Sequence, residues 1–231
     1  MLEICSYPTV PDYEEEVRRQ RSLNVALFRK SLNTSKTKKK LENYAARFGH
    51  EFETVWYRAK VDPLFAEQFA IDPQKQGIHQ KLAFNYLRGL PGVEDAVLLR
   101  NDELWLPVEV RRVGGIPYEV GALQEPVRSK SVDFKWVSHG FTCYVSHKYT
   151  REEGGAQDNQ YEDLKRFVED GCRVRCSNAA VVVIADGAFY TQRGRLRALR
   201  ELGSGSWVPL LVTTVPTFVA DWSVFESKLR G

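Results

Sequence analysis

An aspartate and a lysine each interrupt a stretch that is otherwise rich in aromatic and β-branched residues. Asp133 lies in 131–137 (SVDFKWV), and Lys148 lies in 141–149 (FTCYVSHKY). A charged side chain in an apolar strand is costly unless it has a partner or a task. A carboxylate that binds a divalent cation, beside a lysine that positions water, can hydrolyse a phosphodiester. The pair is therefore a candidate hydrolytic site, with a simple cross-strand ion pair as the alternative.

These two segments predict a β-hairpin, because the sequence between them, SHG at 138–140, is short and contains glycine. A hairpin brings a residue of one strand next to a residue of the other on rigid backbone. Side chains alternate along a strand, so His147 should point to the face opposite to Lys148. Its backbone carbonyl is then a better metal ligand than its ring. Asp133 and His147 are the predicted metal ligands, and Mg²⁺ is the ion that such oxygen ligands suit.

Hydrophobic periodicity and chain breakers predict the remaining elements. The run 179–185 (AAVVVIA) is continuously apolar, as expected of a strand that is covered on both faces. Helices, then strands, then an alternation of the two predict an α/β sandwich around a mixed sheet. We expect a helical lobe at 1–75 and a core at 76–231. The expected helices are 11–31, 41–60, 77–90, 158–170 and 193–202; the expected strands are 104–106, 108–110 and 208–213; a basic loop is expected at 31–40 and a turn at 114–117.

Composition narrows the class of protein. A chain of 231 residues with 43% hydrophobic residues suffices for one large domain, or for a core with an added lobe. It contains no run of about 18 apolar residues, and its acidic N-terminus lacks the apolar region of a secretory signal. The four cysteines have no zinc-site spacing and read as reduced thiols. These features predict a cytoplasmic protein without a membrane-spanning segment.

The net charge of +3 does not by itself indicate a nucleic-acid partner. Its distribution is more informative, because basic residues gather in 18–40 and again in 193–200. Local basic stripes can neutralise phosphates, although a solvated helix face is the alternative. The candidate DNA-contacting side chains, whether they touch bases or only phosphates, are Lys38, Lys39, Lys40, Arg111, Arg112, Arg128 and Lys130.

The ordered set of motifs resembles the type II restriction endonucleases of the PD-(D/E)xK nuclease superfamily. The similar segments are SVDF from Ser131, SHKY from Ser146 and GGAQDNQY from Gly154, within a resemblance that covers residues 72 to 214. The resemblance implies a restriction-endonuclease-like α/β/α core with a mixed central sheet. It implies Mg²⁺-dependent cutting of double-stranded DNA that leaves 5′-phosphate ends. It also implies a homodimer on palindromic sites, with a cognate DNA methyltransferase as the genetic partner.

One departure from the family pattern is Ser146, which stands where the family usually has glutamate or aspartate. Serine cannot supply the second carboxylate. Some family members have serine there and recruit a glutamate from the next helix, and Glu162 stands at the matching distance. A helical wheel, however, places Glu162 nearly opposite the apolar residue Leu164. Gln157 matches the Gln-x-x-x-Tyr motif of exonuclease-type members, and it is the better candidate to face the reaction centre. The predicted catalytic set is Asp133, Lys148, Ser146, Gln157 and Glu162.

Other assignments stay open. Asp133 with Lys135 is itself an acidic-x-lysine tripeptide, with Glu119 upstream, but a strand and not a crossover helix would follow it. His79 and Gln80 on the first core helix are able to approach the site. The alternatives to a restriction enzyme are a decayed nuclease that only binds DNA, and a repair or recombination nuclease that reads DNA structure.

Overall fold

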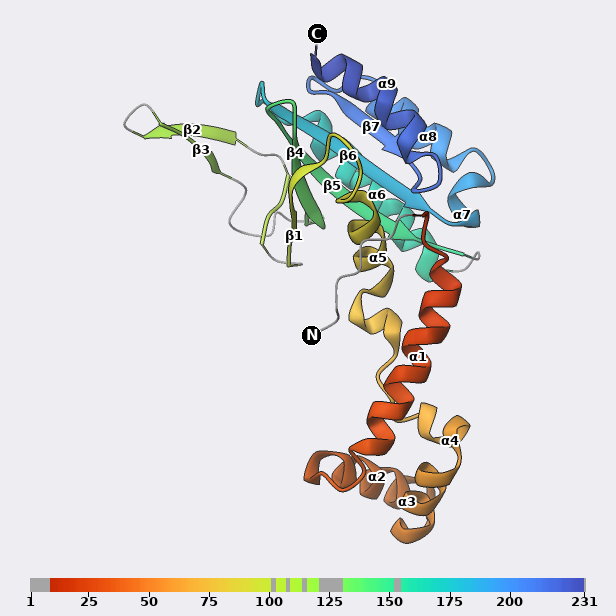
Figure 1. Ribbon diagram of the computed structural model, residues 1–231. Helices are drawn as coiled ribbons and strands as arrows, with labels where there is room; N and C mark the ends of the chain where they lie inside the picture. The colour runs from red at the N-terminus through yellow and green to blue at the C-terminus, as the bar shows by residue number, and fades with distance from the viewer. Residues whose placement is uncertain are drawn as a thin grey trace. The chain divides into compact units, whose positions relative to one another are not determined.

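The computed structural model describes residues 9–100, 103–106, 109–113, 116–120, 131–151 and 155–230, with the backbone alone at 109–113, 116–120 and 155–157. The chain divides into two compact units, a helical unit over Pro11–His79 and a second unit from Gln80 onward (Figure 1). The division falls at Gln80, inside a helix, whereas the sequence places the boundary after residue 75. Among the helices of the described residues, none combines the length and the apolar character that a membrane span requires.

The helical unit begins with a capped helix. Asp12 precedes it and accepts hydrogen bonds from the amides of Glu14 and Glu15 (both 3.0 Å), which would otherwise lack partners. Buried residues of four helices then form one apolar core, which includes Phe28, Leu41 and Phe65. The helices of this unit are α1 (Tyr13–Lys30), α2 (Ser35–Phe48), α3 (Phe52–Val61), α4 (Pro63–Glu67) and the 3₁₀ helix η1 (Pro73–Gln76).

Two predictions for this unit are wrong. The basic segment 31–40, predicted as a loop, is helical from Ser35, because Thr34 caps α2 and Thr37 and Leu41 anchor its first turns in the core. The single helix predicted at 41–60 is two helices. Gly49 adopts the left-handed conformation (φ +68°) and ends α2, as glycine often does at this position.

The second unit is built on a five-stranded mixed sheet with strand order β1-β4-β5-β6-β7. The pairs β1–β4 and β4–β5 are antiparallel, and the pairs β5–β6 and β6–β7 are parallel. The predicted α/β class with a mixed sheet is thus confirmed. The strands are β1 (Glu94–Leu98), β4 (Phe134–Ser138), β5 (Phe141–Tyr149), β6 (Ala179–Asp186) and β7 (Leu210–Thr213).

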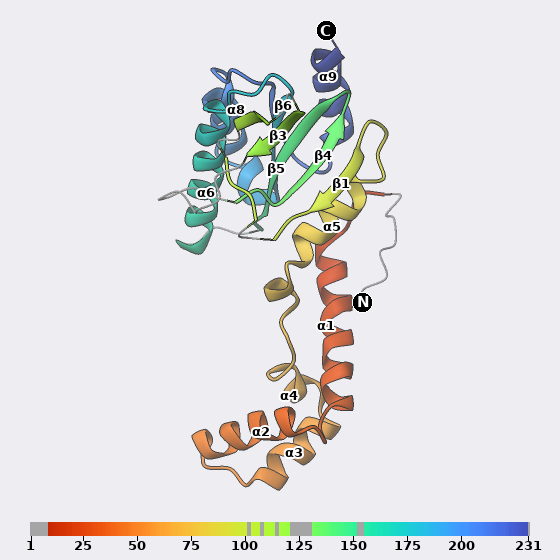
Figure 2. The ribbon, with the colours of Figure 1, turned by 90° about the vertical axis from the view of Figure 1, so that its left-hand side faces the viewer.

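Helices cover both faces of this sheet. Figure 2 shows α6 and α8 on one side and α9 on the other. On the α6 side, Leu164 and Phe167 pack against Val181 and Val183 of β6, which explains why this strand is buried along its whole length. On the other side the rings of Phe218 and Trp222 of α9, and of Phe84 of α5, contact β4 aromatics. The helices are α5 (Ile78–Leu87), α6 (Gly155–Cys172), α7 (Ala188–Thr191), α8 (Arg195–Gly203) and α9 (Phe218–Arg230).

The region between β1 and β4 differs from the prediction. Residues 104–106 form no strand, and Trp105 makes only an isolated bridge with Ser131. Strands β2 (Glu109–Val113) and β3 (Ile116–Val120) pair antiparallel in a separate two-stranded sheet. Ile116 and Pro117, predicted in a turn, begin β3.

The predicted hairpin is confirmed. Residues His139 and Gly140 join β4 to β5, and both have positive φ angles (+47° and +80°). This is the backbone of a type I′ turn, whose twist matches the flanking strands. The register that follows places Phe134 opposite Val145, so Asp133 lies beside Ser146.

Candidate active site

The site lies where β4 begins and β5 ends. The backbone of Asp133 is fixed from three directions: its amide donates to the Val145 carbonyl (2.8 Å), and its carbonyl accepts from the Leu99 amide (3.0 Å) and the Gln80 side chain (3.2 Å). Gln80 therefore reaches the site from α5, as the sequence allowed. His79 belongs to the helical unit, where its ring contacts Tyr13. The Asp133 side chain is held on a backbone that has little freedom to move.

The Asp133 carboxylate is the centre of the site. Its Oδ2 accepts from the His147 amide (2.7 Å) and from the Ser146 hydroxyl (3.1 Å), and the Lys148 ammonium lies 3.4 Å away. All three donors belong to consecutive residues of β5 and approach the same oxygen. Oδ1 receives none of these three bonds. The structure therefore brings three of the predicted catalytic residues together: Asp133, Ser146 and Lys148.

Lys148 extends from the last part of β5 on the sheet face that α6 covers, in register with Ala185 of β6. Its side chain is 19% exposed, whereas Asp133 is 5% exposed. At 3.4 Å the contact between their charged groups is mainly electrostatic. The carboxylate is thus buried while the Lys148 side chain is only partly buried, as a residue that meets a phosphate must be. Lys148 is the lysine bonded to Asp133, and Glu119 of the competing assignment lies in the separate sheet, on β3.

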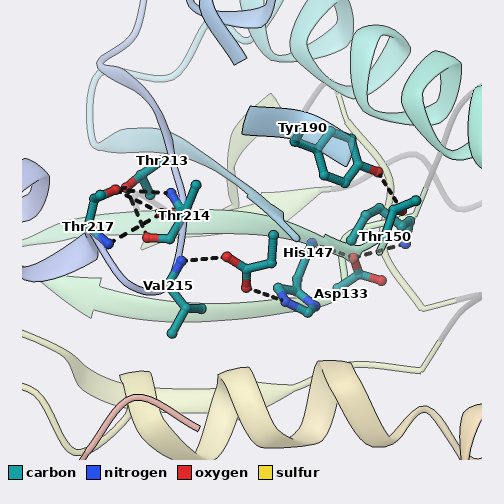
Figure 3. Close-up of polar contacts among 10 residues, drawn as sticks. Asp133, His147, Thr150, Tyr190, Thr213, Thr214, Val215 and Thr217 are labelled. Atoms are coloured by element: carbon teal, nitrogen blue, oxygen red, sulfur yellow. Dashed lines mark hydrogen bonds and ion pairs between the residues drawn. The ribbon is translucent and has the colours of Figure 1, made fainter. Parts of the chain in front are cut away.

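His147 points to the other sheet face, as predicted. Its buried ring places Nε2 3.0 Å from Asp186 Oδ2 at the end of β6. Asp186 Oδ1 in turn accepts from the Val215 amide (2.6 Å), just beyond β7 (Figure 3). The carboxyl ends of three parallel strands are therefore linked beneath the site. The sequence gives no sign of this contact of Asp186, because strand alternation does not show which residues meet across strands.

A second polar group holds the chain where it leaves β5. The Thr150 amide donates to the Asp186 carbonyl (2.8 Å), and its hydroxyl donates to Gln160 of α6 (2.7 Å) and contacts the Tyr190 hydroxyl (3.2 Å; Figure 3). Gly187 has φ +98°, and a β-carbon there would collide with the Thr150 carbonyl. Burial raises the pKa of Tyr190 to about 12, so this hydroxyl stays protonated. These contacts fix the start of α6 relative to Lys148.

Two oxygen atoms of the site fit a magnesium ion. The N–H and C=O groups of one strand residue point to the same side, so the His147 carbonyl lies on the same edge of β5 as the amide that donates to Asp133. Asp133 Oδ1 and the His147 carbonyl are hard ligands of the kind that Mg²⁺ takes while it keeps several waters. Within the described residues no group of three or more histidine, cysteine, aspartate or glutamate side chains is placed to hold a metal. Asp133 is the carboxylate that the described residues place at this point.

The following helix supplies no second carboxylate from Glu162. This residue is exposed on α6 and accepts from Lys165 (3.0 and 3.2 Å). Leu164 and Phe167 occupy the buried face of the helix, as the helical wheel indicated. Gln157 lies in the first turn of α6, where the structure describes the backbone alone. Recruitment of Glu162, which the family resemblance raised, does not occur in this structure.

The predicted DNA-contacting residues fall into three groups. Lys38, Lys39 and Lys40 lie on α2, and the ammonium group of Lys40 donates to the Phe69 carbonyl (2.6 Å). Arg111 and Arg112 lie on β2, where the backbone alone is described. Arg128 and Lys130 lie outside the described residues.

Comparison of the chain with protein-family models, with curated proteins and with solved structures gives no match. The geometry of Asp133, Lys148 and the backbone around them is what remains to indicate a function.

Proposed function

We propose that this chain is a Mg²⁺-dependent endonuclease that cuts double-stranded DNA, of the type II restriction class that its motifs resemble. The observation that carries the proposal is the meeting of the Asp133 carboxylate and the Lys148 ammonium group, 3.4 Å apart, at the carboxyl end of β5. The His147 carbonyl, on the same edge of β5 as the amide bonded to Asp133, would complete a place for a cation and a phosphate. The proposal includes 5′-phosphate ends, a homodimer on palindromic sites and a cognate methyltransferase encoded nearby.

Each residue has a distinct task in this proposal. Asp133 Oδ1 and the His147 carbonyl would hold the magnesium ion, which supplies Lewis-acid stabilisation and makes bound water more acidic. Lys148 would orient the attacking water and offset the negative charge that builds on the phosphate. The Ser146 hydroxyl and the His147 amide hold Asp133 Oδ2 in place, so that Oδ1 stays turned toward the ion. Gln80 steadies the Asp133 backbone.

The direct test is cleavage of long duplex DNA. Purified protein would be incubated with unmodified and with methylated genomic DNA of known sequence, with Mg²⁺ or with EDTA. We expect discrete fragments only with Mg²⁺, and sequencing their ends gives the recognition site. Asp133→Asn should abolish cutting, while Lys165→Ala, which changes an exposed lysine on α6, should not. Absence of cutting on both DNAs at millimolar Mg²⁺ would count decisively against the proposal.

A second candidate is a decayed nuclease that binds DNA without cutting it. The observation that favours it is Ser146, which is fully buried and offers a neutral hydroxyl where the family has a carboxylate. Such a protein would bind duplex DNA equally well with and without Mg²⁺ and would leave it intact. A nuclease that reads DNA structure would instead cut nicked or branched duplexes and spare plain ones, so the same assay with those substrates separates the three cases.

A further inference from the structure

The connection between α2 and α3 has a specific form. α2 ends at Phe48 and α3 begins at Phe52, so a three-residue turn of Gly49, His50 and Glu51 joins them. Gly49 adopts the left-handed conformation, and the His50 amide donates to the Ala45 carbonyl (2.9 Å), which closes the end of α2. A short turn that contains glycine is the connection found in helix-turn-helix units.

The two helices pack together through small residues. Ala45 of α2 and Val55 and Ala59 of α3 are buried in the same core, which also contains Phe28 of α1 and Phe65 of α4. The Arg29 side chain donates twice to the Lys60 carbonyl (2.9 and 2.6 Å) and so binds the last turn of α3 to α1. Packing on one side therefore sets the position of α3, while its other side carries exposed residues.

The outer side of α3 carries exposed side chains, among them Lys60, whose ammonium group lies 5.3 Å from the centroid of the Trp56 ring. Val55 and Ala59 face inward, so Glu53, Tyr57 and Lys60, spaced at i, i+4 and i+7, face outward. Tyr57 is 62% exposed. A tyrosine between a carboxylate and an ammonium group offers a flat apolar surface with hydrogen-bonding groups on both sides, as a base-reading surface needs.

The charge of the neighbouring α2 indicates the partner. Between Ser35 and Phe48, α2 has five basic residues and one acidic residue, Glu42. Lys38 and Lys39 are exposed, while Lys40 is bonded to the Phe69 carbonyl. Dense positive charge on one helix complements a phosphate backbone. Glu51 and Glu53 at the start of α3 disfavour phosphate there, but a carboxylate accepts well from the amino group of cytosine. The basic residues of α2 are Lys36, Lys38, Lys39, Lys40 and Arg47.

We propose that α2 and α3 form a helix-turn-helix that reads duplex DNA: α3 presents Glu53, Tyr57 and Lys60 to base edges, and Lys38 and Lys39 of α2 contact phosphates. The inference deepens the proposed function and rests on it for the choice of DNA as partner. It assigns sequence reading to an element remote in sequence from Asp133 and Lys148.

The first part of the test measures phosphate contacts. The full chain is titrated in EDTA, where no cutting occurs, against a fluorescent duplex at several salt concentrations. Lys38→Ala with Lys39→Ala should lower the slope of log affinity against log salt by about two units, about one for each lost contact. Lys228→Ala, an exposed lysine on α9, is the matched control and should leave the slope unchanged.

The second part measures sequence reading. The wild-type chain selects a preferred sequence from a randomised duplex pool, and each variant is then compared on that sequence and on the unselected pool. Tyr57→Ala and Glu53→Gln should weaken binding to the preferred sequence by about 5- to 150-fold while they change binding to the pool little. Val224→Ala on α9, also exposed, should change neither.

The outcomes separate this inference from the proposed function. If the chain never cuts DNA but the Tyr57→Ala variant binds DNA more weakly, the helix-turn-helix proposal stands and the nuclease proposal fails. If the Tyr57→Ala and Glu53→Gln variants cut DNA with an unchanged site preference, the nuclease proposal stands and the helix-turn-helix inference is overturned. Absence of any duplex binding in EDTA, or an unchanged salt slope in the double lysine variant, overturns the inference as well.

Discussion

The imidazole of His147 lies 3.0 Å from the Asp186 carboxylate, on the sheet face opposite to Lys148. The amide of the same histidine donates to Asp133 Oδ2 (2.7 Å) on the site side. One residue of β5 thus joins a buried carboxylate below the sheet to the candidate catalytic carboxylate above it. Because Asp186 also accepts from the Val215 amide, a shift of β6 or β7 would be transmitted to Asp133.

We expect Asp186→Ala to destabilise the fold strongly. The variant leaves the His147 ring and the Val215 amide without their buried acceptor, at a cost of about 3 kcal/mol in the free energy of unfolding. Asp186→Asn keeps an oxygen for the Val215 amide and should cost less. Urea unfolding of both variants checks this, with Glu42→Ala on exposed α2 as the control that stays within about 0.5 kcal/mol of wild type. If the midpoint for Asp186→Ala stayed at the wild-type value, the buried network would have no structural role.

The sequence predicted those parts of the fold whose signal is local. The hairpin with its His139-Gly140 turn and the fully covered β6 each have a pattern that is visible in a few residues. Strand β1 was not predicted, because the burial of its residues does not alternate and the strand is held by pairing with β4. The break between α2 and α3 was not predicted, because the apolar spacing continues across Gly49. The left-handed backbone of Gly49 in the structure shows the turn.

The candidate site was predictable to the extent that it lies within one hairpin. Asp133, Ser146 and Lys148 meet because antiparallel register places them side by side, and that register follows from the short turn. The contributions of Gln80, Asp186 and Val215 come from other elements and depend on how these pack. The charged pair and the approach of Gln80 were thus visible in the sequence, whereas the support from Asp186 and Val215 was not.

Stability should fall with pH in the alkaline range, because two buried acids keep their protons in the folded state. Burial raises the pKa of the Cys143 thiol from 9.0 to about 12, and that of Tyr190 from 10.0 to about 12. Between these values the unfolded chain has released protons that the native chain retains. Each group therefore lowers the free energy of unfolding by up to about 1.4 kcal/mol per pH unit, first above about pH 9 and more steeply above about pH 10.

Urea unfolding of wild type, Cys143→Ala and Tyr190→Phe at a series of pH values measures these slopes. Each variant carries a constant packing cost, so the slope and not the midpoint is the readout. We expect Cys143→Ala to be flatter than wild type from about pH 9, and Tyr190→Phe to be flatter only from about pH 10. Parallel curves for all three proteins would show that neither group titrates differently in the folded state.

Lys148→Met should abolish cleavage and keep the fold. Asp133 Oδ2 would still accept from the His147 amide and the Ser146 hydroxyl, so the site backbone should stay in place. Loss of the group that orients water should lower the cleavage rate by at least about 100-fold. Rates on a fixed duplex, with circular dichroism as the check on folding, measure both effects.

Glu162→Ala should cut at the wild-type rate, since it removes only an exposed pair with Lys165. If the Glu162→Ala variant cut DNA slowly, Glu162 would again be a candidate catalytic residue.

Ser146→Asp should make the stability of the protein depend on divalent cations. The serine is fully buried and donates to Asp133 Oδ2 (3.1 Å), so an aspartate there sets a second negative charge beside the first. Two adjacent carboxylates repel each other unless a cation lies between them. We therefore expect a lower melting temperature than wild type in EDTA, and a larger rise on addition of Mg²⁺ than wild type shows. Ser146→Ala loses one hydrogen bond, at a cost of about 1 kcal/mol, and should gain nothing from Mg²⁺ beyond the wild-type response. Thermal unfolding at matched ionic strength decides the matter, because a Ser146→Asp protein that ignores Mg²⁺ would mean that no cation binds beside Asp133.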